Sequence, residues 1–257
     1  MSEIKEIFHY REMIFMLVRR DLRARYKRSA LGFAWTFLNP LLQLLVYTAV
    51  FSVVMRAGIE RYYLFLFVAL IPWMAMASSV NNGAGCVTGQ ANLVTKIRFP
   101  RQVLPITAVT TNFVNMLLCM VVVLAVCALT VGLELRVLWF LLPCILIEYV
   151  LALGVALLVS SLTVYFRDLE HILTIFTMAW QFLSPVMYSA DMVPDRFRLI
   201  FALNPMSPIL VAIRDVLYYR RAPEALTMGS SLFAAIAVLL LGWFVFKKLE
   251  RRFAEEL

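Results

Sequence analysis

Long apolar runs, separated by short polar and basic segments, make up most of the chain. A helix needs about 20 mostly apolar residues to cross a bilayer, and six runs approach or exceed this length. The six runs cover residues 31–55, 62–82, 103–131, 137–165, 171–189 and 226–246. The pattern predicts an all-α integral membrane protein with six transmembrane helices.

Composition supports a bilayer rather than water as the solvent. Of the 257 residues, 63% are apolar and 16% are charged, against roughly 45–50% and 25% in soluble domains. The first 30 residues carry eight Lys or Arg, and no small-residue cleavage pattern follows the first apolar run. We therefore expect that run to remain in the membrane as a helix.

The basic residues set the expected orientation. If both ends of a six-span chain face the cytoplasm, 16 of the 24 Lys and Arg fall on the inside and eight on the outside. The positive-inside rule therefore predicts cytoplasmic N- and C-termini. Because topology explains the net charge of +8, nucleic acid is not expected as a partner.

Residues 1–30 form an expected first unit, ahead of the membrane domain at 31–257. Apolar residues recur near helical spacing over 4–28, with basic residues among them. This predicts an amphipathic helix on the cytoplasmic membrane surface. Two interpretations stay open: the basic cluster docks a partner, or it only satisfies the inside rule and attracts anionic lipid.

The segment between the fifth and sixth runs, about residues 190–225, contains two apolar stretches too short to cross. Asn204, Pro205 and Pro208 lie between them. Short apolar helices broken by prolines fit a re-entrant hairpin that protein shields in the outer leaflet. An ordinary external loop is the alternative.

Motifs for catalysis, cofactors and metals are absent from the sequence. It contains no Gly-x-x-x-x-Gly-Lys-Ser/Thr phosphate loop, no His-Glu-x-x-His and no Gly-x-Ser-x-Gly. Its four cysteines form no Cys-x-x-Cys pair. Asp191 and Asp195 are the only obvious carboxylate pair, and their spacing across Pro194 indicates a turn. We expect neither an enzyme nor a bound metal or cofactor.

Several ordered motifs carry a resemblance to the polysaccharide-exporting ABC-2 permeases. They run from about residue 19 to the C-terminus and comprise Arg20 to Trp35, Asn39 to Leu42, Asn92 to Pro105, Phe166 to Glu170, Ser184 to Pro194, Asn204-Pro205, Arg214-Asp215 and Arg252 to Glu255. Their order and number make them more specific together than any one alone. The sequences of these motifs are most similar to those of O-antigen exporters, with wall teichoic acid and capsule exporters as near relatives.

The resemblance implies a transporter subunit in the cytoplasmic (inner) membrane. It implies a homodimer of permeases with two copies of a separate ATPase subunit, which would bind ATP and Mg²⁺. The implied substrate is an undecaprenyl-linked polysaccharide moved outward between the permeases. Two alternatives stay open: a drug or lipid exporter with the same fold, and a membrane-embedded glycosyl or acyl transferase.

The resemblance also assigns a coupling helix at about residues 84–100, against the alternative of a simple connector. The expected ATPase-coupling residues are Arg20, Arg23, Arg25, Asn92, Lys96, Arg98, Phe99 and Arg101. At a second cytoplasmic motif, Asp168 is expected to cap the fifth span, and Arg167 is expected to anchor the fourth at the interface.

Three residues inside the predicted spans are candidates for the glycan path. Tyr47 and Trp180 carry flat aromatic faces with polar edges, which suit stacking on sugar rings. Glu148 is the only acid well inside a predicted span. A carboxylate at that depth costs a few kcal/mol, so we expect a hydrogen bond between helices or a polar contact with sugar hydroxyls.

Overall fold

The computed structural model describes residues 3–26, 29, 31–54, 58–197, 201 and 203–257. Within these ranges the regular structure is entirely helical. Five helical segments are long and apolar enough to cross a membrane: Gly32–Phe51, Tyr62–Ala84, Val103–Thr130, Leu135–Tyr165 and Ala225–Arg252. The predicted all-α membrane architecture is confirmed at this level.

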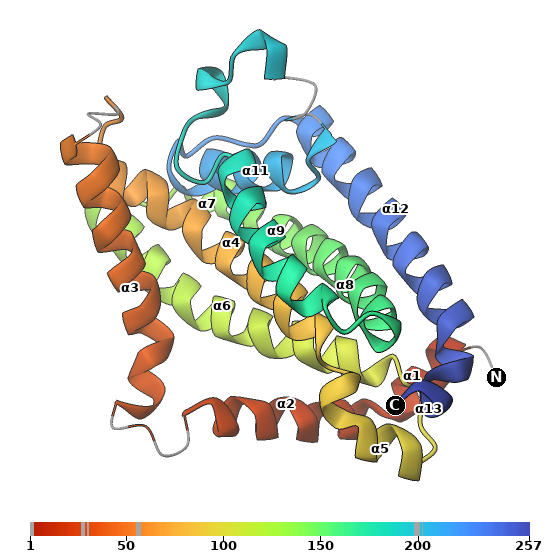
Figure 1. The fold of residues 1–257 in the computed structure, drawn as a ribbon. Coiled ribbons are helices and arrows are strands. Elements are labelled where there is room, and N and C mark those ends of the chain that lie inside the picture. Colours follow the sequence, from red (N-terminus) through yellow and green to blue (C-terminus); the bar gives the residue numbers. More distant parts are fainter. Residues whose placement is uncertain (1–2, 27–28, 30, 55–57, 198–200, 202) are drawn as a thin grey trace.

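The N-terminal segment forms two helices rather than one. Helix α1 covers Glu3–His9 and α2 covers Arg11–Tyr26, with a turn at Tyr10 between them. Figure 1 shows α2 running across one end of the bundle, here called the α2 end. Leu17 and Val18 are buried there, so α2 packs on the bundle through one face.

The first span begins with a short turn at Gly32–Ala34, followed by α3 at Trp35–Thr48 and a π-helical extension at Ala49–Val54. Gly32 adopts φ +47°, a left-handed conformation that glycine tolerates without steric cost. This residue reorients the chain before α3, which stands at one side of the molecule (Figure 1).

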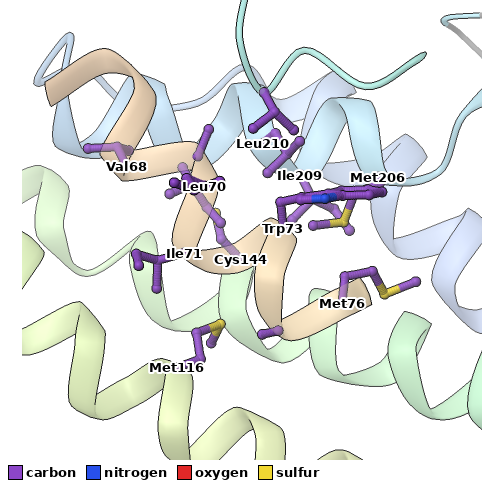
Figure 2. Close-up of a cluster of buried hydrophobic side chains, with 14 of the residues drawn as sticks. Val68, Leu70, Ile71, Trp73, Met76, Met116, Cys144, Met206, Ile209 and Leu210 are labelled. Atoms are coloured by element: carbon purple, nitrogen blue, oxygen red, sulfur yellow. The ribbon is translucent and has the colours of Figure 1, made fainter. Parts of the chain in front are cut away.

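Helix α4, Tyr62–Ala84, lies at the centre of the bundle. It contacts α3, α6 (Val103–Thr130), α8 (Leu141–Tyr165), α9 (Leu169–Leu183) and α11 (Met206–Leu217). A helix that is apolar on all sides is expected to be buried. Figure 2 shows this core, in which α4 places Ile71 toward Met116 of α6, Leu70 toward Cys144 of α8 and Trp73 toward Met206 of α11.

The predicted span at 171–189 corresponds to α9, which has 15 residues and ends at Leu183. Pro185 follows closely, and proline disfavours a helical conformation in the residue before it. The helix is therefore shorter than the five segments that are long enough to cross a membrane, and it is not one of them. Both termini lie at the α2 end, and α9 ends beside α11 (Figure 1).

The outer segment has short helical turns at Ala190–Met192 and Asp195–Phe197, followed by α11. The first predicted apolar stretch, 199–203, falls largely outside the described residues. The second lies in α11, whose Ile209, Leu210 and Ile213 are buried. Pro205 precedes this helix, and Pro208 lies in its first turn, where the lack of an N–H costs little.

The last span, α12, covers Ala225–Leu249 and packs along α8. It continues through a turn at Glu250–Arg252 into α13, Phe253–Glu256. The predicted coupling helix at 84–100 is much shorter: a turn at Thr88–Gln90 leads into α5, Ala91–Lys96, which ends before an extended Ile97. α1, α5 and α13 gather at the α2 end (Figure 1).

Candidate functional site

A polar slot of about 480 Å³ opens between α3, α4 and α6. Its lining combines amides and hydroxyls with one large aromatic side chain. The lining residues are Ser29, Trp35, Thr36, Asn39, Pro40, Ile71, Met74, Ala75, Ser78, Asn112, Asn115, Met116 and Cys119. Three of the helices that the apolar runs place in the membrane therefore enclose polar groups.

The amides occupy adjacent turns of their helices. On α6, Asn112 and Asn115 are three residues apart and both buried. On α3, the Gln43 side-chain amide donates to Asn39 Oδ1 at 3.1 Å. Burying an amide costs about 1–3 kcal/mol unless it is hydrogen-bonded. Polar residues at these depths are accordingly typical of sites where water or a polar ligand lies inside a bundle.

Polar side chains continue from the slot toward the α2 end. A second cavity, of about 250 Å³, shares Asn112 with the slot and reaches Asp21, Asn82, Gln90 and Thr111. Asn82 Nδ2 donates to Asn112 Oδ1 at 3.1 Å. The two cavities thus follow one line of polar groups along α4 and α6.

This lining suits a ligand rich in hydroxyl groups. Asparagine and serine side chains supply both donors and acceptors, and Trp35, which is 41% exposed, offers an aromatic face beside them. The described residues contain no cluster of three or more His, Cys, Asp or Glu that could hold a metal. The amide and hydroxyl groups of the slot can bind a ligand by hydrogen bonds.

The predicted coupling residues divide between exposed and packed positions. Asn92, Lys96 and Arg98 are exposed, and Phe99 is partly buried. The Arg101 guanidinium donates to the Glu250 carbonyl and lies over the Phe253 ring.

Two further contacts bind this region together. Gln102 Nε2 donates to Glu250 Oε2 at 3.0 Å, and Tyr10 donates to the Arg98 carbonyl at 3.4 Å. The N-terminal helices, the α5 region and the C-terminal turn therefore form one packed unit, centred on the fully buried Phe253.

On α2, Arg20 pairs with Asp21 at 2.9 Å, and Arg23 is exposed. Arg25 is part of the helix, but its side chain lies outside the described part of the structure. α2 and the α5 region thus lie at the same end of the bundle (Figure 1), and their role in coupling stays a prediction.

The Phe166–Glu170 motif, which the sequence predicts to be cytoplasmic, contacts the connection before α5. Arg167 and Asp168 are exposed, and Asp168 occupies the N-cap of α9 without the side-chain capping bond that we expected. Glu170 makes the contact between the two segments, because it accepts a hydrogen bond from Thr88 Oγ1 at 3.2 Å. This contact joins the start of α9 to the turn that leads into α5.

No hydrogen bond or ring contact among the described residues joins any two of Tyr47, Trp180 and Glu148. Tyr47 is partly buried against the core. Trp180 is buried edge-to-face on Trp73, with ring centroids 5.5 Å apart. Glu148 is fully buried, and both carboxyl oxygens lack a hydrogen-bond partner within the described residues. Among the described residues the expected hydrogen bond between helices is therefore not seen at Glu148, and its contact with sugar hydroxyls stays a prediction.

Asn204 is the centre of a hydrogen-bond network in the outer segment. It accepts from Trp180 Nε1 at 2.8 Å and from the Met206 N–H at 3.1 Å, and it donates to Ser184 Oγ at 2.8 Å. Trp180 therefore uses its polar edge to hold this segment. Its proposed contact with sugar stays a prediction.

The structure reveals two groups whose roles sequence reasoning missed. One is the amide lining of the slot, whose only signal was the spacing of polar residues within apolar runs. The other is Arg214, which is 3% exposed and donates to the carbonyls of Phe65, Val186 and Tyr188. Arg214-Asp215 had appeared only as a motif, without a structural role.

Comparison with known proteins places the chain in a family. The family model described as ABC-2 type transporter matches residues 12–218. The chain is 37% identical to the O-antigen export system permease protein RfbA of Myxococcus xanthus, covering 99% of this chain and 98% of that protein. It is 32% identical to a Klebsiella pneumoniae protein of the same name, over 95% and 94% of the two chains.

A more distant similarity involves a second kind of polysaccharide transporter. The Escherichia coli polysialic acid transport protein KpsM is 22% identical, over 91% of this chain and 92% of that protein. The family match covers most of the chain, and the O-antigen permeases align with it nearly end to end. On this evidence, the chain belongs to the ABC-2 type transporter family.

Proposed function

We propose that the chain is the membrane subunit of an exporter that moves lipid-linked polysaccharide of the O-antigen type out of the cytoplasm. The sequence similarity to O-antigen export permeases, which covers nearly the full length of both chains, carries this proposal. The amide-lined slot supports it, because sugar hydroxyls match its donors and acceptors. As a member of this family the chain is a transporter component and not an enzyme.

A separate ATPase subunit, holding ATP and Mg²⁺, would supply the energy, and two copies would serve a homodimer of this chain. Lys96 and Arg98 are exposed beside α5, where they are accessible to such a subunit. The packed unit around Phe253 would carry its motion into α12, and the bond between Thr88 and Glu170 would carry it into α9.

The proposed homodimer would meet through helices that present apolar side chains outward. On α3, Leu45 and Val46 are exposed, and on α9, Ile175, Phe176 and Phe182 are exposed. Both faces are wide enough to meet either lipid or a second copy. If the pathway runs between two copies that meet through α3, Tyr47 on that helix would lie close to it, and its contact with glycan stays a prediction.

Two measurements test the proposed function: the amount of glycan exported to the cell surface, and the stimulation of ATP hydrolysis by the substrate. We expect undecaprenyl-diphosphate-linked glycan to stimulate ATP hydrolysis by this chain reconstituted with its ATPase. Asn39→Ala combined with Asn115→Leu should lower this stimulation and surface glycan about thirty-fold, since each of the two lost hydrogen bonds contributes roughly 1 kcal/mol.

The matched control is Ser230→Ala, which removes an exposed hydroxyl on α12 whose one hydrogen bond among the described residues goes to the Thr227 carbonyl. Export should then be unchanged. Stimulation by hydrophobic drugs but not by the glycolipid would contradict the proposed substrate class. Normal export by the Asn39/Asn115 variant with wild-type folded yield would exclude the slot as the sugar contact.

We further propose that α9 is the sixth crossing, that both termini face the cytoplasm of the inner membrane, and that α11 belongs to a re-entrant outer hairpin. The common end of the two termini supports an even number of crossings (Figure 1). The burial of α11 against α4 and α8 supports a hairpin shielded by protein.

Cysteine labelling on intact cells tests this topology. In a background without native cysteines, a membrane-impermeant maleimide should label Arg136→Cys and Arg196→Cys but not Arg167→Cys or Arg252→Cys. All four positions are exposed in the structure, so the labelling reports the side of the membrane. If α9 does not cross, positions 167 and 196 will behave alike.

A further inference from the structure

A groove of about 950 Å³ lies between α2 and α6, apart from the polar slot. Its lining is apolar except for three arginines and one threonine. The lining residues are Arg11, Ile14, Phe15, Val18, Arg19, Leu22, Arg23, Gly32, Phe33, Thr110, Val114 and Leu118. The groove is therefore an apolar surface with a basic rim.

Both features come from one face of α2. Positions 11, 14, 15, 18, 19, 22 and 23 all line the groove, and residues three and four apart share one side of a helix. Four apolar and three basic residues thus share this face along about 18 Å of helix. Val18 is buried, whereas Phe15 is 68% exposed and Phe33 is 50% exposed, so the apolar surface is uncovered at these two aromatic side chains.

The charge on the rim is not neutralised by the protein. Arg19 and Arg23 are exposed and make no ion pair with any residue that the structure describes. No carboxylate lines the groove. Arg20, in contrast, pairs with Asp21. The unmatched charge beside an exposed apolar surface calls for a ligand that is both anionic and apolar.

We propose that this groove binds an anionic phospholipid of the bilayer, with its phosphate on Arg19 and Arg23 and an acyl chain along α6. The α6 row of Thr110, Val114 and Leu118 extends about 12 Å from α2. This length is close to the roughly 15 Å of hydrocarbon in one leaflet, which suits an acyl chain better than the much longer chain of a polyprenyl carrier. The bound lipid would fix α2 against α6, beside the packed unit that contains α5.

The proposal goes beyond the transport of polysaccharide, and its test does not require transport. The protein would be purified from membranes that contain phosphatidylglycerol and phosphatidylethanolamine, and the retained lipid would be measured by native mass spectrometry. We expect phosphatidylglycerol to be retained preferentially. Arg19→Gln combined with Arg23→Gln should lower its retention at least about five-fold, the effect of roughly one basic residue at an anionic surface.

Two matched variants separate a specific site from general charge and apolar surface. Lys248→Gln combined with Arg252→Gln removes two exposed charges at the same end, outside the groove, and should leave retention unchanged. Val114→Trp fills the groove and should lower retention, whereas Val121→Trp, at a 64% exposed position on the same helix, should not.

Three results would overturn the proposal. The first is unchanged retention in the Arg19/Arg23 variant, and the second is an equal loss in the Lys248/Arg252 control. The third is displacement of phosphatidylglycerol by equimolar undecaprenyl phosphate, which would make the groove a site for the carrier lipid. If the chain proved not to transport polysaccharide, the lipid measurements would still test this proposal, because they do not depend on transport.

Discussion

Replacing Gly154 with alanine is expected to disrupt the packing of α12 on α8. A Cβ atom at position 154 would lie 2.6 Å from the Cα and N of Leu239 and 2.7 Å from the carbonyl carbon of Val238. These are backbone atoms, so no side-chain rotation relieves the overlap, and α12 must move. Overpacking typically costs about 1–3 kcal/mol, which we expect as a lower melting temperature and a folded yield reduced about ten-fold.

The chain provides a matched control in Gly229→Ala. Gly229 also lies in a span, α12, and a Cβ there meets no heavy atom within 4 Å. Alanine should be tolerated or slightly stabilising at this site, since it is the better helix former by about 1 kcal/mol. Equal melting temperatures for Gly154→Ala and Gly229→Ala would refute the close approach of the two helices.

The close approach also bears on coupling. Gly242 of α12 faces Gly154 directly, with a built Cβ 3.0 Å from the Gly154 carbonyl carbon. Small residues at such crossings let membrane helices pack by close backbone contact. α12 leads directly into Glu250, which binds Arg101 and Gln102. A displaced α12 would therefore also loosen the unit around Phe253, and residual folded Gly154→Ala protein should show reduced coupled ATP hydrolysis.

The apolar runs were sufficient to predict most of the membrane architecture. The span predicted at 62–82 is observed at Tyr62–Ala84, and that at 103–131 at Val103–Thr130, because unbroken apolar sequence of this length has few alternatives to a buried or spanning helix. The run at 171–189 predicted a helix that extends too far, because the hydropathy of the run does not show that the helix ends at Ser184-Pro185.

Pairing between helices was beyond the reach of one sequence. Asn39, Ser78 and Asn115 are polar residues in three separate runs, and only the tertiary structure brings them to one slot. Trp180 shows the same limit, since its aromatic face suggested sugar stacking while its Nε1 binds Asn204, 24 residues away. Motif order identified the correct family, but it did not indicate these contacts.

Replacing Arg214 with methionine is expected to release the outer segment from the bundle. The Arg214 guanidinium donates to Phe65 O at 3.2 Å, Val186 O at 2.6 Å and Tyr188 O at 3.2 Å. It also lies over the Phe65 ring, 3.6 Å from the centroid. Hydrogen bonds to charged groups contribute about 1.5–3 kcal/mol each, so losing all three should cost about 4.5 kcal/mol or more.

Lysine should not rescue this position. Its ammonium is a point charge, whereas the planar guanidinium of arginine presents several donors in fixed directions. Three carbonyls that lie apart on α4 and on the segment after α9 require such directions. The melting temperature of Arg214→Lys should therefore be closer to that of Arg214→Met than to that of the wild type, although lysine retains the charge.

A cysteine in place of Met187, which is 3% exposed, reports the release directly. In a background without native cysteines, Met187→Cys should react slowly with maleimide, and Arg214→Met should accelerate the reaction at least ten-fold. Arg196→Gln provides the control, because Arg196 is exposed and its ring contact is with the adjacent Phe197. Slow labelling in Arg214→Met would contradict the prediction. It would mean that the Asn204 network and the hydrogen bond from Tyr62 to the Met187 carbonyl hold the segment without Arg214.

Fast labelling with a nearly unchanged melting temperature would have a different meaning. The outer segment would then be a unit that opens independently of the bundle, which is the property that an exit gate for the polysaccharide requires.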